Sequence, residues 1–216
     1  MGARYEMPDD AVLYVATASG RIAVTAEDRS DLEVDPPDRR VEIEDGSRKV
    51  KIKSKSGSLN IRCPIGTNIS VGVISGRINL EGTFGTVKVG SVSGNIEVDS
   101  ATGDVDARTV SGNLSVNRCD GSCKLHTKSG RISIGMAGKE ASAFTISGSI
   151  EIGTAGRGEI EAHTVSGRVA VHVAEGRHPK VRLRSLSGRL RCDCEQGSDF
   201  EINVKTLSGS ADITEL

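Results

Sequence analysis

A Ser-Gly pair that recurs at near-constant spacing constrains this chain more than any other feature. From residue 56 onward the pairs lie 18 to 21 residues apart, and the earlier gap of 37 residues equals about two such steps. A fixed period of this length is typical of repeat proteins, in which each unit packs on its neighbours. The ten pairs begin at Ser19, Ser56, Ser75, Ser93, Ser111, Ser129, Ser147, Ser166, Ser187 and Ser208.

Each repeat contains two short strands and two turns. Ser93-Gly94 is followed by the alternating segment 95–98 (NIEV), a turn with Gly103, and a second alternating segment at 105–107 (VDA). Period-2 alternation of β-branched residues indicates strands with one apolar face. A two-strand unit cannot bury that face alone, so the units must stack. We therefore predict an all-β fold, a parallel β-solenoid of about ten two-strand coils, each hydrogen-bonded to the coils before and after it.

The inward positions predict two continuous aliphatic ladders, with the glycine of each pair at a sharp bend. A Ser or Thr hydroxyl at the bend can hydrogen-bond the neighbouring coil. A three-sided hexapeptide coil or an antiparallel sandwich fits this spacing less well. The first ladder holds Ile78, Ile96, Leu114, Ile132, Ile150, Val169 and Leu190, and the second holds Leu80, Val98, Val116, Ile134, Ile152, Val171 and Cys192.

We expect one domain over 1–216, with regular coils in 55–216 and irregular N-terminal strands that form a cap in 1–54. Within this cap, residues 41–44 and 49–53 alternate around Gly46 and predict a hairpin. Its charged strands would block further edge pairing. The C-terminal end, at 211–213, has no comparable cap.

Composition excludes several classes of protein. Net charge is −1 and there is no basic stripe, which argues against nucleic-acid binding. No apolar run approaches the ~20 residues of a transmembrane segment, and residues 1–8 carry no export signal. The five cysteines cannot all form pairs, as they would in a secreted chain held together by disulfides, so a reducing environment fits better. We expect a cytoplasmic location, with attachment to the envelope through a partner or an anchor as the alternative.

We expect no metal and no cofactor. Two cysteine pairs, Cys119 with Cys123 and Cys192 with Cys194, could supply four thiolates to zinc. However, the pairs lie about four coils apart, roughly 20 Å at the strand spacing. Cys123 and Cys192 also occupy ladder positions, so we interpret them as small buried hydrophobic residues.

No catalytic residue is predicted. The alternation places His126 and His163 in one outward column, separated by the coil that carries Phe144, which is too far apart to share an ion. The recurring serines are interpreted as structural, because a nucleophile is needed once and beside a base. The glycine doublets and recurring Asp of calcium-binding β-rolls are missing.

Two outward columns are candidate interaction surfaces. If alternation continues through the bend, an apolar stripe lies outside and marks an interface; the alternative is that the bend turns these residues inward as a third ladder. The second column is polar and could meet a carboxylate- or phosphate-bearing surface. The stripe comprises Ile74, Val92, Val110, Ile146, Val165, Leu186 and Leu207, interrupted by Lys128, and the polar face contains Arg77, Arg131, Arg168 and Arg189 among Asn and Ser residues.

Repeats such as 91–96 (SVSGNI) and 109–114 (TVSGNL) carry a family resemblance. The chain resembles the bacterial putative-adhesin β-repeat family, whose domains are also called toastrack domains. The resemblance covers nearly the whole chain and implies a β-helix-like fold. For some members of the family, the resemblance also implies attachment to membrane-anchored envelope-stress proteins. It supplies no catalytic residues.

These features predict a non-enzymatic scaffold or binding module, adhesin-like or envelope-associated. It would engage another protein or a cell-envelope component through its long faces. One alternative is a structural protein that self-assembles into filaments by stacking its terminal coils. A polysaccharide-active enzyme is less favoured, because no outward column combines paired acids with aromatic residues.

Overall fold

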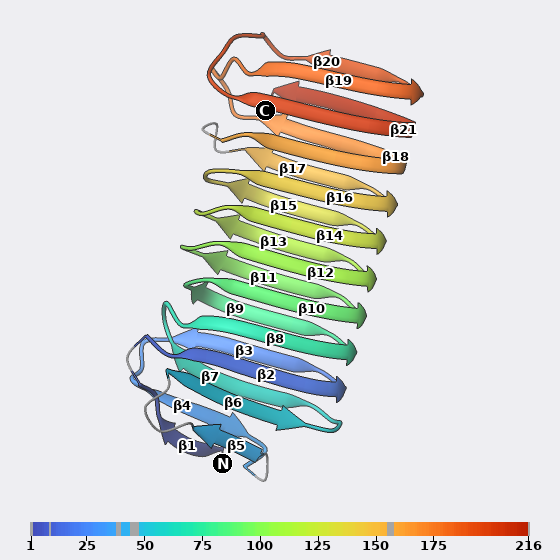
Figure 1. Cartoon of the computed structure of the whole chain (residues 1–216). Coiled ribbons are helices and arrows are strands. Elements are labelled where there is room, and N and C mark those ends of the chain that lie inside the picture. The colour runs from blue at the N-terminus through green and yellow to red at the C-terminus, as the bar shows by residue number, and fades with distance from the viewer. Residues whose placement is uncertain (1, 9, 38–39, 44–47, 155–157, 216) are drawn as a thin grey trace.

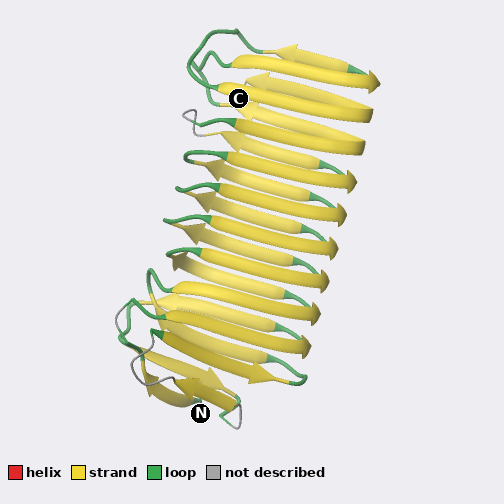
Figure 2. Cartoon of the chain, viewed as in Figure 1, coloured by secondary structure: helices red, strands yellow, loops and turns green. Residues whose placement is uncertain are grey.

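A computed structural model describes residues 2–8, 10–37, 40–43, 48–154 and 158–215. Within these residues the regular structure consists of 21 β-strands and no helix (Figure 2). The strands stack into a rod, with the N-terminus at one end and the C-terminus near the other (Figure 1). The chain alternates between two long faces, mostly with parallel pairing, which confirms the predicted β-solenoid.

The strands of each face follow a fixed spatial order from the N-terminal end of the rod. On the first face the order is β5 (Arg40–Ile43), β6 (Lys49–Ser54), β2 (Val12–Ser19), β8 (Asn68–Ser75), β10 (Val87–Ser93), β12 (Val105–Ser111), β14 (Cys123–Ser129), β16 (Ala141–Ser147), the first halves of β18 (Ile160–Val173) and β21 (Glu201–Glu215), and β19 (Lys180–Ser187). On the second face it is β1 (Ala3–Glu6), β4 (Asp31–Asp35), β7 (Leu59–Pro64), β3 (Ile22–Glu27), β9 (Ile78–Phe84), β11 (Ile96–Ala101), β13 (Leu114–Cys119), β15 (Ile132–Ala137), β17 (Ile150–Thr154), the second halves of β18 and β21, and β20 (Leu190–Asp193).

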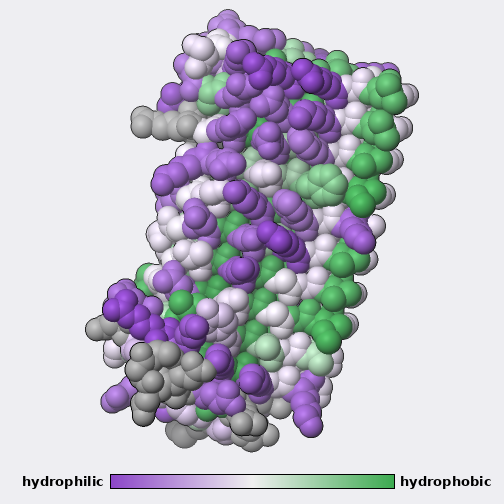
Figure 3. Space-filling model, in the orientation of Figure 1, coloured by the Kyte–Doolittle hydropathy of each residue, from purple (hydrophilic) through white to green (hydrophobic). Residues whose placement is uncertain are grey.

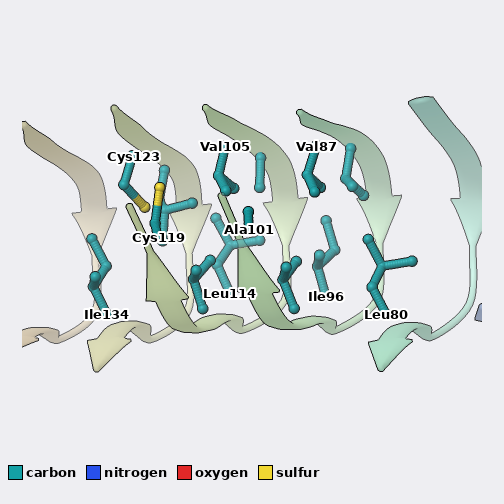
Figure 4. Packing of buried hydrophobic residues seen from close by; sticks show 14 of the residues in the cluster. Leu80, Val87, Ile96, Ala101, Val105, Leu114, Cys119, Cys123 and Ile134 are labelled. Carbon is teal, nitrogen blue, oxygen red and sulfur yellow. The ribbon is translucent and has the colours of Figure 1, made fainter. Parts of the chain in front are cut away.

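The core is a set of aliphatic ladders between the two faces. Ile96 pairs with Ile78 on one side and Leu114 on the other, and Val98 pairs in the same way with Leu80 and Val116. These residues are almost fully buried. Figure 4 shows the ladders of both faces meeting in the interior. The predicted register is therefore confirmed through the middle of the chain, where side chains alternate between core and solvent.

The order of the coils departs from the sequence at the N-terminal end. The β2–β3 coil lies between the β6–β7 coil and the β8–β9 coil, so the prediction of strictly sequential stacking is wrong here. The sequence predicts an irregular cap over residues 1–54, but within this range β2 and β3 form a regular coil. Their inward residues, such as Leu13 and Ile22, are buried and continue the apolar ladders of the coils beside them. The antiparallel strands β1, β4 and β5 cover this end, and β5 with β6 forms the predicted hairpin.

The C-terminal end is permuted as well. Strand β21, the last in sequence, lies between β18 and the β19–β20 coil. The ladders therefore run from Val169 through Ala211 to Leu190, and the sequential prediction is wrong here too. The burial of the two strands reflects this order. The inward apolar residues of β21 are fully buried, whereas those of β19, at the exposed end, are only partly buried.

The Ser-Gly bend requires glycine for two reasons. Gly112 has φ +154°, a backbone conformation that other residues rarely adopt. A Cβ on Gly112 would also lie 2.0 Å from the carbonyl oxygen of Gly94 in the adjacent coil. At the adjacent Ser129-Gly130 bend, the Thr127 hydroxyl lies within hydrogen-bonding distance of two carbonyl oxygens, that of Ser129 and that of Gly112 in the preceding coil. The glycines thus stack directly on one another along one side of the rod.

Candidate interaction surfaces

The seven apolar residues that precede the Ser-Gly pairs lie on the surface, and we call them the apolar ridge. Thr109 is buried and the next residue, Val110, is 41% exposed, so the alternation continues as far as Val110 and ends at Ser111, which is exposed as well. The exposed fraction ranges from 37% at Val165 to 81% at Leu186. The alternative that the bend turns these residues inward is therefore wrong.

The ridge is continuous along one edge of the rod except at one position. Strand register places its members in the spatial order Ile74, Val92, Val110, Lys128, Ile146, Val165, Leu207 and Leu186. Figure 3 shows this column along the right edge, with a hydrophilic interruption part-way. Seven steps between neighbouring strands give it a length of about 34 Å. Toward the N-terminal end the column continues with the small Ala18 and then Lys55, so the large aliphatic side chains end at Ile74.

The predicted polar face is exposed, but its arginines are not brought together. Arg77, Arg131, Arg168 and Arg189 are all exposed, yet other coils separate each from the next. Ser210 of β21, for example, lies between the strands that carry Arg168 and Arg189. In the middle of this column the side chains stabilise the bends. The backbone N–H of Asn113 donates to Asn95 Oδ1 at 3.1 Å. The Arg131 amide donates in turn to Asn113 Oδ1 at 2.9 Å.

The two histidines of the first face lie in the column predicted for them. Phe144 pairs with His126 on one side and His163 on the other, and the rings of His126 and Phe144 are 6.0 Å apart. Burial lowers the pKa of both imidazoles, with further lowering from Arg108 at His126 and from Lys205 at His163. Both rings therefore favour the neutral form in the folded protein. The sequence had not singled out Phe144, 38% exposed, as an apolar surface residue.

The cysteines fall into two environments. Cys123 is buried in the ladder between Val105 and Ala141, as predicted. Cys192 and Cys194 are only half-buried, with their sulfurs 3.2 Å apart, so Cys192 packs against the core but is not the buried residue that was predicted. The reason is that β20 belongs to the last coil of the stack. Within the described ranges, no three or more His, Cys, Asp or Glu side chains form a potential metal site.

The family follows from comparison with known proteins. The model of the family described as Toastrack DUF4097 matches residues 7–155. The chain belongs to the Toastrack DUF4097 family. The matched segment extends from the N-terminal cap through β17, so this toastrack chain shares the family pattern over its central coils.

Solved structures give more distant matches. A "putative adhesin" from Bacteroides fragilis is 13% identical, with 100% of this chain and 96% of that chain covered and a TM-score of 0.41. A "putative adhesin" from Parabacteroides merdae is 11% identical, with 99% and 95% covered and a TM-score of 0.41. A "putative cell adhesion protein" from Clostridium sporogenes is 7% identical, with both chains fully covered and a TM-score of 0.33. No curated protein matches the toastrack chain. In the part of the chain that the structure describes, no helix could span a membrane.

Proposed function

We propose that this toastrack chain is a non-enzymatic binding module that engages a partner protein through the apolar ridge. The observation that carries the proposal is the exposure of seven aliphatic side chains in one line about 34 Å long. Single exposed apolar residues are ordinary, whereas a contiguous apolar line bordered by polar residues is typical of protein interfaces.

The rigidity of the fold supports this use of the ridge. Each ridge residue projects from a strand paired with its neighbours in the stack, on both sides except at Leu186, whose strand β19 pairs with β21 alone. The side chains are therefore held at fixed spacing before a partner arrives. Such preorganisation lowers the entropy cost of association. A partner with its own linear apolar surface, such as the apolar face of a helix or an extended strand, fits this geometry. The ridge, rather than the dispersed arginines, is therefore the proposed contact.

The remaining parts of the proposal concern chemistry and location. The non-enzymatic part of the proposal rests on the repeat, because its serines recur in every coil, whereas a nucleophile is needed once and beside a base. We propose a cytoplasmic location, with attachment to the envelope through the partner as the alternative. Fractionation of cells that express the chain at its natural level distinguishes these two locations.

The test is a matched pair of ridge variants. A partner is first isolated from the source organism by cross-linking and identified, and its Kd for the purified chain is then measured. Val110→Lys lengthens the polar interruption, removes an apolar contact worth about 1 kcal/mol and adds the cost of placing an unpaired ammonium group against an apolar surface. We expect at least a tenfold weaker Kd, equivalent to about 1.4 kcal/mol. Lys128→Val closes the interruption, and we expect it to tighten binding.

The control for both variants is Lys124→Val, which changes the same residue types on an outward strand position away from the ridge. It should leave the Kd unchanged. Equal affinity of the wild type, Val110→Lys and Lys128→Val would overturn the proposal. Sedimentation velocity on the isolated chain provides a separate check: a dimer that Val110→Lys dissociates would identify the ridge as a self-association surface instead.

A further inference from the structure

The two ends of the rod differ in the length of their outermost strands. At the N-terminal end, the outermost strands β5 and β1 run antiparallel to their neighbours and have only four residues each. At the C-terminal end, β19 pairs with β21 on one side, and on its other side no described strand pairs with it. Because β19 has eight residues, it offers a long unpaired edge. Such an edge is a ready template for an added strand.

The backbone groups of β19 that face this open edge can be assigned. The Lys180 amide donates to the Phe200 carbonyl at 2.7 Å, so the peptide groups of Lys180 are directed toward the covered side. Successive residues of a strand direct their N–H and C=O groups to opposite edges. The N–H and C=O groups of Val181, Leu183 and Ser185 are therefore directed outward. They can complete a parallel or antiparallel ladder with another strand.

The end of the core is also exposed at this coil. Val181 and Leu183 pack against the core but remain half-exposed, whereas their partners Ile202 and Val204 in β21 are fully buried. On the second face Leu190 is 39% exposed. An added strand with apolar residues at every second position would cover Val181 and Leu183. Burial of this surface would favour association.

The outward side chains define the charge of the strand that fits. β19 presents Lys180, Arg182 and Arg184 and carries no acidic residue. Arg182 pairs with Glu201, but Arg184 lies in register with Lys205, so two cations are adjacent. A hollow of about 220 Å³ is lined here by Glu161, Arg182, Arg184, Asn203 and Lys205. Carboxylates at the outward positions of an added strand would therefore meet an excess of positive charge.

We propose that the open edge of β19 is a strand-addition site for an extended acidic segment of a partner protein, in which apolar and acidic residues alternate. A second copy of this chain is a poorer occupant. Pairing β19 with another β19 would place its lysine and arginines beside the same cations, and like charges opposite each other destabilise paired strands. The site is at the end of the rod and is separate from the mode of binding proposed for the apolar ridge.

The probe is a fluorescent nine-residue peptide of alternating Glu and Val, with blocked ends, titrated against the full chain by fluorescence anisotropy. Peptides that alternate Lys and Val, or that contain the Glu and Val residues in scrambled order, serve as controls. We expect saturable binding of the alternating Glu peptide only, weakening as salt rises from about 0.05 to about 0.3 M because of charge screening. Absence of saturable binding, or equal binding of the three peptides, would overturn the proposal.

The decisive variants are Ser185→Pro and its matched control Ser185→Ala. Proline removes the outward N–H without removing a hydrogen bond to β21, and edge strands tolerate such a proline. We expect Ser185→Pro to weaken peptide binding at least tenfold and Ser185→Ala to leave it unchanged. Unaltered circular dichroism and thermal unfolding would show that both variants fold.

Charge reversal keeps the test valid if the proline variant fails to fold. Arg184→Glu should weaken binding of the Glu peptide at least tenfold and allow the Lys peptide to bind. Unchanged affinity for the Glu peptide in Arg184→Glu would contradict the proposal. So would a concentration-dependent dimer of the wild-type chain that Arg184→Glu alters, because the occupant would then be a second copy.

Discussion

Replacing Gly112 by alanine should destabilise the rod far more than replacing Gly90, which lies in the middle of β10, a strand paired with β12, whereas Gly112 directly follows β12. The new Cβ at 112 would lie 2.0 Å from the Gly94 carbonyl oxygen, well below the 3.0 Å limit of real Cβ contacts, so the two backbones must separate by about 1 Å. That movement weakens the bonds between these two coils, from the Gly94 amide to Ser111 O at 3.0 Å and from the Ile96 amide to Asn113 O at 2.9 Å.

The cost can be estimated from these effects. A non-glycine residue in this φ region is strained by about 1–3 kcal/mol, and each weakened hydrogen bond contributes about 1 kcal/mol. Gly112→Ala should therefore lower the free energy of unfolding by roughly 3–5 kcal/mol. At Gly90 an added Cβ meets nothing within 4 Å. Gly90→Ala should be neutral or stabilise by about 0.4–1 kcal/mol.

The assay is urea unfolding followed by far-ultraviolet circular dichroism, with both variants compared with the wild type. A drop of several kcal/mol for Gly112→Ala together with no loss for Gly90→Ala would support stacking of the glycines of adjacent coils. The reasoning is refuted if the two variants unfold at the same urea concentration. It is also refuted if Gly112→Ala is as stable as the wild type.

Three further predictions concern different parts of the rod. In the folded protein at pH 8, iodoacetamide should modify the half-buried Cys192 before Cys63, because burial raises the pKa of the Cys63 thiol to about 11. Peptide mass spectrometry gives the order of modification, and reaction of Cys63 before unfolding would contradict the prediction. Because the pKa values of His126 and His163 are lowered, the stability they contribute is present above the ordinary value of 6.5 and is lost as pH falls through the lower folded-state values. The thermal midpoint should accordingly fall from pH 7 to pH 5, and less steeply in His126→Gln/His163→Gln; an identical fall in the variant would refute this. Deleting 201–216 removes β21, the strand through which β19 and β20 are hydrogen-bonded to the rest of the rod. Limited proteolysis should then cleave within 180–193, and continued protection of this segment would contradict the inserted position of β21.

The regular middle of the rod could be predicted from sequence because each coil repeats the same constraints. Ile96 and Val98 alternate with polar residues, and Gly94 recurs in phase with Gly112, so both the ladders and the bend follow from the period. The coil order at the ends could not be predicted in this way. The inward residues of β2 and β21 fit any position along the ladder, since every position accepts similar aliphatic side chains.

The surfaces were predictable only in part. Alternation through Thr109 and Val110 placed the ridge outside, but the path of the bend could have turned it inward. Lys128 at the equivalent position was a sequence signal for exposure, because a lysine would not be buried without a partner. The open edge of β19 depended on where β21 lies, and that position could not be read from the repeat.

Site-specific photo-cross-linking in living cells shows directly whether the apolar ridge is the contact surface. A photoreactive phenylalanine analogue is placed at Val92 and Val110 on the ridge, and at Lys88 and Lys124 on outward positions away from it. If the ridge is the contact surface, one partner protein is cross-linked from both ridge positions and not from the two lysine positions. Cross-linking of that partner from Lys88 and Lys124 but not from the ridge would show that the contact lies elsewhere.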